Sequence, residues 1–188
     1  MTTRPITEKE YKELQTLIAT GFEYLENGKL KKFRPNKQLL LAITLESNLG
    51  LRISDVEKLT NNNFKNGCLE ITEKKTGKLQ YRELNSQIYN IVKDYVIENG
   101  LKKDEPLIKV KTRAIQKQLK IVTDYMGLKN ISTHSFRKFF ATNQYENNNN
   151  NIELVKELLN HSSIATTQKY IRVSQQAINN ASKNYFVG

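Results

Sequence analysis

The sequence predicts a mostly α-helical single domain over residues 1–188 with one small antiparallel sheet, an α+β fold. Most of the chain carries apolar residues at helical spacing, and one central stretch changes to the alternation that is typical of strands. The sequence contains no internal repeat and no linker that divides the chain. With 188 residues, the chain is long enough to form one domain with a substantial core.

The N-terminal part is expected to hold three helices. The first spans residues 7–26, begins with the capping-box sequence TEKE, and has an apolar stripe that includes Leu25. The segment GKLKKFRP is predicted to be a basic loop that ends at Pro35. The next segment, KQLLLAITLE, is apolar on nearly every side, which is typical of a buried helix. Gly50 ends this helix, and a short helix is expected to start near Ser54.

A β-hairpin is predicted in the middle of the chain. The segments CLEIT at 68–72 and LQYREL at 79–84 alternate between apolar and polar residues. Gly77 lies between them, where a turn is required. The turn would carry three lysines: Lys74, Lys75 and Lys78.

Helices are expected again in the C-terminal half. The first two span residues 86–99 and 112–126, and Gly127 closes the second. The buried face of the first is predicted to comprise Ile88, Ile91, Val92 and Tyr95. Three further segments read as helices, with a polar loop, ENNNNN, after the first of them: STHSFRKFFATNQY, IELVKELL and SQQAINNASKNYF.

The chain is strongly basic, with 30 Lys and Arg against 19 Asp and Glu and a net charge of +11. This excess favours a polyanionic partner such as nucleic acid, although a solvated basic surface without a partner is the alternative. On the helix predicted over 112–126, three basic residues share a face away from the apolar stripe: Arg113, Lys117 and Lys120. They are candidates for DNA contact, and a merely solvated face fits the spacing equally well.

The cysteine count and the hydropathy pattern bound the location of the protein. Cys68 is the only cysteine, which excludes a disulfide framework and a cysteine-rich zinc site and suits a reducing compartment. Residues 1–19 are charged and lack the apolar core of a secretory signal. No apolar run approaches the roughly 20 residues needed to span a bilayer. We therefore expect a soluble cytoplasmic protein.

Several polar residues are candidates for chemistry, and each has an ordinary structural explanation when taken alone. The two histidines are His134 and His161, and Arg137 follows the first by one helical turn. Histidines beside helix ends are more often structural than catalytic. Arg52 could pair with Asp55, the hairpin lysines could serve solubility, and Tyr170 could be half-buried packing.

The order of these motifs is more specific than any one of them. GLRISD, KKTGK, HSFR, LLNHSS and a tyrosine nine residues after the last histidine follow one another along the chain. From about Thr7 to its end, this chain resembles the tyrosine recombinase family, the phage-integrase-like DNA strand-exchange enzymes. The resemblance implies the catalytic-domain fold of DNA breaking–rejoining enzymes. It also implies six catalytic residues: Arg52, Lys75, His134, Arg137, His161 and Tyr170.

The resemblance further implies how these residues act. Tyr170 would attack the phosphorus of a phosphodiester, His134 would take the phenol proton, and Lys75 would protonate the departing 5′ oxygen. The K-T-G frame selects Lys75 rather than Lys74, so that Lys74 and Lys78 remain as DNA contacts.

The remaining motif residues would bind the phosphate. The two arginines would stabilise charge on its non-bridging oxygens, a duty that many phosphoryl-transfer enzymes give to metal ions, and His161 would add a hydrogen bond. Asp55 would orient Arg52. We expect no cofactor and no metal.

The sequence departs from the family pattern at three places. Asn160 stands where Gly is more usual, and an Asn-rich insertion lengthens the gap between Arg137 and His161. The helical N-terminal core-binding domain of longer members is expected to be absent, because residue 7 already begins the catalytic domain. The chain is then either an excised domain or a natural single-domain recombinase.

Alternatives to recombination remain, and so do choices of assembly. A type IB topoisomerase-like enzyme shares the tyrosine chemistry, and a non-catalytic DNA-binding regulator could keep the fold. The expected partner is double-stranded DNA, with a monomer in solution and a homotetramer on paired sites. The segment SQQAINNASKNYF at 174–186 would form a helix that packs either on a neighbouring subunit or on its own domain.

Overall fold

The computed structural model describes residues 3–73, 75, 77–171, 179 and 182–185. The chain forms two compact units, Met1–Phe140 and Ala141–Gly188. The predicted mostly α fold with antiparallel β structure is confirmed, and where one small sheet was predicted the described residues form a two-stranded and a three-stranded antiparallel sheet. Within the described part of the chain, no helix is both long enough and apolar enough to cross a membrane.

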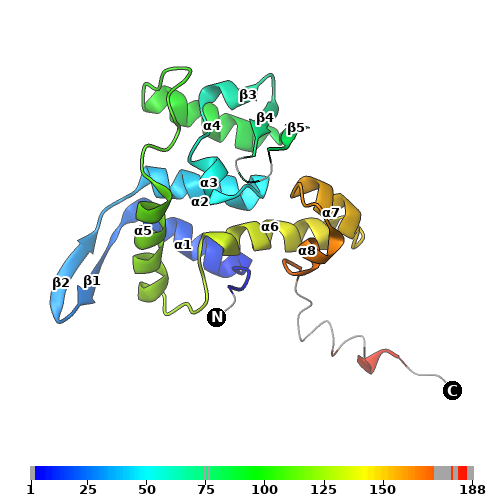
Figure 1. The fold of residues 1–188 in the computed structure, drawn as a ribbon. Helices are drawn as coiled ribbons and strands as arrows, with labels where there is room; N and C mark the ends of the chain where they lie inside the picture. Colours follow the sequence, from blue (N-terminus) through cyan, green and yellow to red (C-terminus); the bar gives the residue numbers. More distant parts are fainter. Residues whose placement is uncertain (1–2, 74, 76, 172–178, 180–181, 186–188) are drawn as a thin grey trace. The chain divides into compact units, whose positions relative to one another are not determined.

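The first unit is built on helices around one apolar core (Figure 1). The predicted capping box is present, because Thr7 Oγ1 accepts from the Glu10 N–H and the Glu10 carboxylate accepts from the Thr7 N–H. The helices of this unit are α1 (Glu8–Thr20), α2 (Lys37–Leu49), α3 (Ile53–Val56), the 3₁₀ helix η1 (Asn61–Asn63), α4 (Ser86–Glu98), α5 (Thr112–Tyr125) and the start of α6 (Thr133–Asn147). As predicted, α2 is buried on most sides, and Gly50 ends it in the left-handed conformation (φ 61°).

Residues 21–33 form a hairpin, so the prediction of a long first helix followed by a loop is wrong. β1 (Phe22–Glu26) pairs antiparallel with β2 (Lys29–Phe33). α1 ends before Gly21, whose positive φ (76°) and close approach to β2 require glycine, because a Cβ there would lie 2.5 Å from the Phe33 carbonyl oxygen. Asn27 and Gly28 both have positive φ, as a two-residue hairpin turn requires. Leu25, expected on the helix stripe, is instead 74% exposed.

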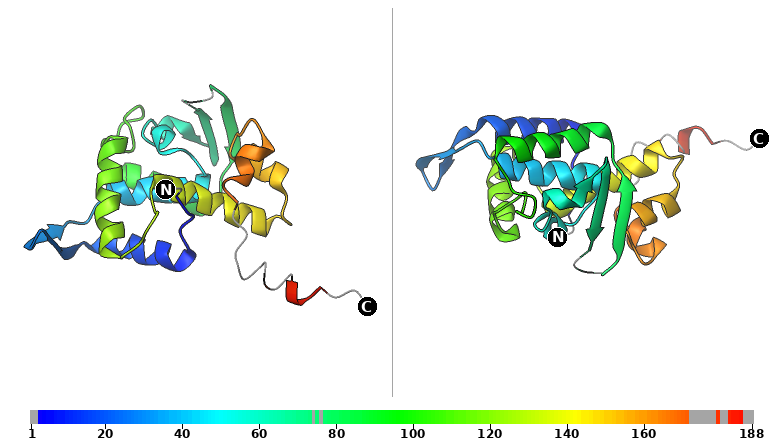
Figure 2. Two further views of the ribbon diagram at one scale, coloured as in Figure 1. Left: turned by 60° about the horizontal axis from the view of Figure 1, so that its bottom comes forward. Right: turned by 90° about the horizontal axis from the view of Figure 1, so that it is seen from above.

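Aromatic stacking fixes the base of this hairpin. The Phe22 ring stacks on Tyr125 of α5, with ring centroids 4.2 Å apart, and on Phe33, with centroids 5.0 Å apart. The hairpin extends away from the helices of the first unit, beside α5 (Figures 1 and 2). It therefore presents its outer part to solvent or to a partner.

The predicted central hairpin is confirmed as two strands of a three-stranded antiparallel sheet (Figure 2). β4 (Cys68–Thr72) pairs with β5 (Leu79–Glu83), and a short β3 (Phe64–Lys65) that the sequence did not indicate pairs with β4. Leu69 and Ile71 face the core. The turn after β4 carries Lys75, whereas the predicted DNA contact Lys74 lies outside the described residues.

The buried faces of α4 and α5 differ in how well periodicity predicted them. On α5, Ile115, Leu119 and Val122 are buried, which fits the apolar stripe predicted on this helix. On α4 the buried residues are Ile88, Val92 and Val96, whereas Ile91 is 45% exposed. The α4 stripe is thus rotated toward Val96, because a run of apolar residues on a short helix leaves the orientation undecided.

The second unit contains the end of α6, α7 (Ile152–Leu158) and α8 (Ile164–Gln168). α6 and α7 lie where helices were predicted, and between them Asn149 and Asn150 adopt positive φ. α8, which was not predicted, is capped by Ser163, whose hydroxyl accepts from the Thr166 N–H. Most of the helix predicted over 174–186 lies outside the described residues.

Candidate active site

Arg52 lies where the chain passes from α2 to α3. The left-handed Gly50 reverses the chain after α2, and Arg52 takes the N-cap position of α3 with an extended backbone. Its side chain is 14% exposed. The guanidinium is therefore held largely within the first unit, with part of its surface open.

The carboxylate that contacts Arg52 most closely belongs to Glu73, at the end of β4. Arg52 Nη1 donates to Glu73 Oε2 at 2.6 Å, and Gln80 Nε2 of β5 donates to Glu73 Oε1 at 2.8 Å. Asp55, the residue expected to orient Arg52, lies farther away, with Oδ2 4.0 Å from Arg52 Nη1. Sequence patterns did not indicate Glu73 and Gln80, which lie 21 and 28 residues after Arg52. Glu73 directly follows β4 and Gln80 lies in β5, and only the fold brings these strands beside Arg52.

Two more arginines donate to the last carbonyls of α2. Arg137 Nη1 donates to the Gly50 carbonyl, and Arg82 Nη2 of β5 donates to the Leu49 carbonyl. The carbonyls that end a helix carry partial negative charge, which suits both guanidinium groups. Arg137 is fully buried. Burial and the neighbouring Arg137 charge lower the pKa of Arg82 to about 10, although Glu73 opposes the shift.

A buried carboxyl group lies behind this cluster. Glu46 of α2 is 1% exposed, and its carboxylate accepts from the Ile53 N–H at the start of α3. Burial raises the pKa of Glu46 well above its ordinary range, while the Arg137 charge and this hydrogen bond oppose the shift. Glu46 Oε2 has no hydrogen-bond partner among the residues that the structure describes.

Replacing Glu46 by Gln is expected to raise the melting temperature at neutral pH. A carboxyl whose pKa is raised on folding stabilises the fold fully only below its unfolded pKa, near 4.5, and this stabilisation is lost as pH rises through the folded pKa. Gln does not titrate, so the variant does not lose this stability. The difference in melting temperature between the variant and wild type should be near zero at pH 4 and grow toward pH 7. Each 1 kcal/mol gained corresponds to about 2–4 °C for a chain of this size.

Thermal unfolding from pH 4 to pH 8 measures this difference. The matched control is Glu13→Gln, at an exposed position of α1. A Glu46→Gln variant that is less stable than wild type at pH 7 would show that Glu46 is charged and needed as a partner for Arg137.

His134 begins α6 and is surrounded by positive charge. Partial burial lowers its pKa, and the charges of Arg137, Lys138, Arg52 and Lys75 lower it further. The lowered pKa favours the neutral imidazole, which can accept a proton. Four predicted site residues of the first unit, Arg52, Lys75, His134 and Arg137, thus lie within electrostatic reach of one another.

The second unit brings His161 and Tyr170 together. His161 is buried, its Nδ1 lies 3.0 Å from Thr167 Oγ1, and its ring meets that of Tyr170 edge-on with centroids 5.0 Å apart. Asn160 before it has φ 53°, a left-handed conformation that Asn tolerates and Gly favours. This explains why Asn can replace the more usual Gly here. Thr167 was missed, because a threonine in a polar run carries no distinctive signal.

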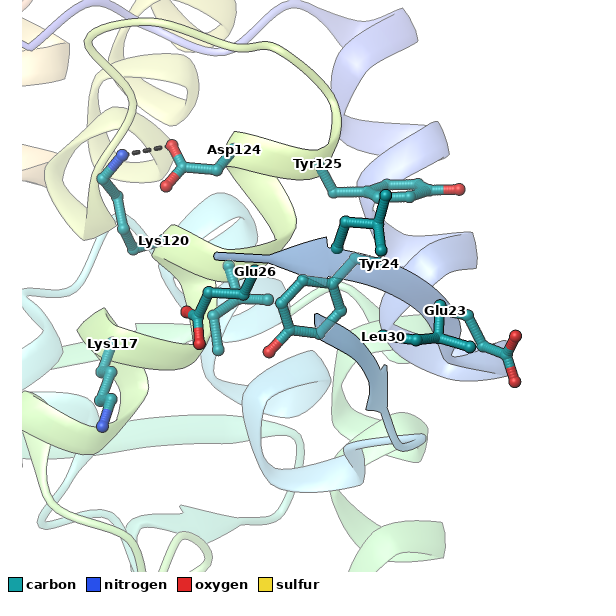
Figure 3. A pocket seen from close by; sticks show the side chains of 10 residues that line it. Glu23, Tyr24, Glu26, Leu30, Lys117, Lys120, Asp124 and Tyr125 are labelled. Atoms are coloured by element: carbon teal, nitrogen blue, oxygen red, sulfur yellow. Dashed lines mark hydrogen bonds and ion pairs between the residues drawn. The ribbon is translucent and has the colours of Figure 1, made fainter. Parts of the chain in front are cut away.

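The basic face predicted on α5 borders a groove (Figure 3). Arg113, Lys117 and Lys120 are all exposed, and the last two line the groove between α5 and the β1–β2 hairpin. Acidic residues share this surface: Glu23 and Glu26 from the hairpin and Asp124, which pairs with Lys120. Lys78, the other predicted DNA contact, is exposed beside the central turn.

Comparisons with known proteins agree on one family. A family model described as the phage integrase family matches residues 6–177. A probable integrase/recombinase of Acholeplasma phage L2 is 29% identical over 194 residues, which cover 97% of this chain and 63% of that protein. The probable integrase/recombinase YoeC of Bacillus subtilis strain 168 is 32% identical over 175 residues, which cover 87% of this chain and 93% of that protein. The chain thus spans less than two thirds of the phage relative.

A solved structure shows the same fold. The crystal structure of the XerH site-specific recombinase in a post-cleavage complex with its palindromic difH substrate matches with a TM-score of 0.71 at 22% identity. The match covers 96% of this chain and 52% of that one. The family model over residues 6–177 shows that this chain belongs to the phage integrase family, and its helices and three-stranded sheet have the fold of a tyrosine recombinase catalytic domain.

Proposed function

We propose that this protein is a site-specific DNA recombinase that cleaves and rejoins DNA through a 3′-phosphotyrosyl intermediate. The observation that carries the proposal is that Arg52, Lys75 and Arg137 lie within electrostatic reach of His134. Such a cluster combines a proton acceptor with three cations, which is what attack on a phosphodiester requires. The family membership supports the same activity.

The first half-reaction is a transesterification at phosphorus. The Tyr170 oxygen attacks the phosphorus, and His134 takes the phenol proton, since a phenol with an ordinary pKa of about 10 is a poor nucleophile at neutral pH. The bond from phosphorus to the 5′ oxygen breaks, and Lys75 protonates that oxygen. The products are a 3′-phosphotyrosyl bond and a free 5′ hydroxyl.

The phosphate is bound by planar donors. Arg52, which keeps an exposed portion, offers a guanidinium fork that matches two oxygens of one phosphate. We propose that Arg137, which is fully buried beside the Gly50 carbonyl in this structure, reaches the same phosphate when DNA binds and that both arginines stabilise the charge that develops there. His161 adds a hydrogen bond from Nε2, while its Nδ1 is engaged by Thr167. Because one phosphodiester replaces another, a second DNA end can restore the backbone without ATP. We propose that no cofactor takes part.

The proposed partner is double-stranded DNA. The net charge of +11 favours it, and the XerH structure contains a DNA substrate. We further propose that the chain is a monomer in solution and assembles as a tetramer on paired sites, and that it acts in the cytoplasm. Its target sequence is a separate question from its chemistry.

A strand-exchange assay tests the proposed function. A pool of nicked duplexes with random central sequence is incubated with the full chain, and detergent-resistant adducts are sequenced to find a cleaved site. That site is then placed in two labelled duplexes and in a supercoiled plasmid. We expect recombinant duplexes. Relaxation of the plasmid without any recombinant duplex would favour the topoisomerase-like alternative, and DNA binding without adducts would favour a regulator.

Replacing Lys75 by Ala is expected to slow cleavage by about 10²–10⁴-fold, the usual contribution of a positioned general acid. A duplex whose departing 5′ oxygen is replaced by sulfur has a leaving group that needs no proton. The Lys75→Ala variant should therefore regain most of its rate on this 5′-thio duplex. Single-turnover cleavage of the two duplexes measures the effect. Rescue of Lys74→Ala, without rescue of Lys75→Ala, would assign the role to Lys74 instead.

The α5 face is proposed to meet DNA backbone phosphates. Replacing Arg113, Lys117 and Lys120 together by Gln should flatten the plot of log K against log salt by about 0.9 for each phosphate that the variant no longer neutralises. Equilibrium binding measured over a series of salt concentrations gives the slope. The control removes equal charge from another surface by replacing Lys9, Lys12 and Lys37 with Gln. Equal slopes in the two triple variants would exclude α5 as a specific contact.

A further inference from the structure

We propose that Glu73 is a positioning residue that holds Arg52 and the turn bearing Lys75 in one fixed arrangement. The inference rests on the proposed function, because it concerns how two groups of that site are placed relative to the same phosphodiester. It assigns a role to a residue outside the six-residue motif set.

The side chain of Glu73 is fully engaged on both oxygens. Oε2 accepts from Arg52 Nη1 at 2.6 Å, and Oε1 accepts from Gln80 Nε2 at 2.8 Å. The Glu73 side chain has no exposed surface, and Gln80 is also buried. A buried carboxylate with one charged and one neutral donor has little freedom to move, so Arg52 is tied to a rigid point of the sheet.

The backbone of Glu73 closes the turn that carries Lys75. The Glu73 N–H donates to the Lys78 carbonyl at 3.0 Å, and the Gly77 N–H donates to the Glu73 carbonyl at 2.9 Å. In sequence, Lys75 therefore lies between Glu73 and the two residues that its backbone binds, Gly77 and Lys78, while the Glu73 side chain holds Arg52. Displacing Glu73 would move both the arginine and the base of the lysine turn.

This linkage matters because Arg52 and Lys75 act on different oxygens of one phosphate. Arg52 acts on a non-bridging oxygen and Lys75 on the departing 5′ oxygen, so the distance between them must match the geometry of the transition state. Misplacement by about 1 Å can cost about 10²-fold in rate. Asp55 is the more distant carboxylate, with Oδ2 4.0 Å from Arg52 Nη1, and it lies on α3 rather than at the hairpin.

Glu73 could instead be a latch that DNA must displace from Arg52. The geometry favours positioning, because the hydrogen bond uses one of the five N–H donors of the guanidinium and the Arg52 side chain keeps an exposed portion. The two roles predict opposite effects of removing Glu73 on the rate of cleavage. A latch slows cleavage, so its removal should accelerate the reaction, whereas loss of a positioning residue should slow it.

Glu73→Gln is the mildest test of this role. The amide oxygen that this variant carries at position 73 can still accept from Arg52. Gln80 Oε1 is buried without a partner among the described residues, so a flip of the Gln80 amide would let it accept from the new NH₂ group. We expect single-turnover cleavage to fall about 10-fold for Glu73→Gln and about 10²-fold for Glu73→Ala, within the range found for residues behind a reactive group. DNA affinity should be unchanged or higher, because a negative charge beside Arg52 is removed.

The matched control is Glu70→Gln, which removes the same charge from the exposed face of β4. A general loss of folding would lower binding and melting temperature together with cleavage, whereas the proposed role lowers cleavage alone. Faster cleavage in Glu73→Gln, or a rate equal to that of the Glu70→Gln control, would overturn the proposal.

A double-mutant cycle on the 5′-thio duplex isolates the link to Arg52, since the role of Lys75 is bypassed there. Glu73→Gln should slow the wild-type background and have no further effect in Arg52→Ala. Equal slowing in both backgrounds would refute the link to Arg52.

The link to Lys75 is tested by comparing the two duplexes. Glu73→Gln should slow cleavage of the ordinary duplex more than cleavage of the 5′-thio duplex, and equal slowing of the two would refute the link to Lys75. Absence of cleavage by the wild-type protein on both duplexes would reject the proposed function itself, and this inference with it.

Discussion

Replacing Tyr170 by Phe is expected to abolish the covalent protein–DNA adduct while leaving DNA binding intact. The substitution removes one oxygen atom, which is the proposed nucleophile, and keeps the ring that meets His161 edge-on. A nicked suicide duplex, which loses a short 5′ fragment after cleavage, accumulates the adduct in the wild-type protein. Denaturing gel electrophoresis then measures the adduct, and a mobility shift under native conditions measures binding.

The matched control for this substitution is Tyr185→Phe, at a residue that is 76% exposed. This variant should form the adduct at the wild-type rate. An adduct that persists in Tyr170→Phe would remove Tyr170 from its assigned role.

Replacing Arg52 by Lys is expected to slow cleavage by about 10²–10³-fold, with DNA affinity within a small factor of wild type. Lysine keeps the positive charge but lacks the planar fork that binds two oxygens of one phosphate, so the missing stabilisation belongs to the transition state. Arg52 is a cleaner test than Arg137, because Arg137 is fully buried and donates to the Gly50 carbonyl. Replacing Arg137 would also disturb the end of α2.

Binding and cleavage must be measured separately for this variant. Equilibrium titration gives the affinity, and single-turnover cleavage at saturating protein gives the rate. Arg34→Lys, at an exposed position, serves as control and should match wild type in both. Equal reductions of affinity and rate in Arg52→Lys would make Arg52 an ordinary phosphate contact.

The helices that sequence patterns predicted are those with a clear period and a clear end. α1 carries its capping box at Thr7, and α2 ends at Gly50 in the left-handed conformation. The β1–β2 hairpin was missed because Leu25 continues the helical period of α1. The stronger local signals were Gly21, whose missing Cβ permits contact with the Phe33 carbonyl, and the Asn27–Gly28 turn.

The residues of the candidate site also fall into those that the sequence predicts and those that only the fold brings together. The motif residues could be selected from the sequence because their order along the chain is specific. The residues behind them could not be selected: Glu46, Glu73, Gln80, Arg82 and Thr167. Glu73 reaches Arg52 only because the sheet is placed beside the end of α2, and Glu46 is a buried carboxyl in a helix that reads as apolar. Such contacts depend on tertiary packing rather than on local pattern.

The chemical identity of the covalent bond tests the central claim most directly. The trapped adduct is digested with protease and nuclease, and mass spectrometry locates the nucleotide on the peptide and identifies the end of the strand to which it is joined. We expect a 3′-phosphate joined to the Tyr170 oxygen and a free 5′ hydroxyl on the released strand. A nucleotide joined to any other residue, or a 5′-phosphotyrosyl bond, would contradict the account.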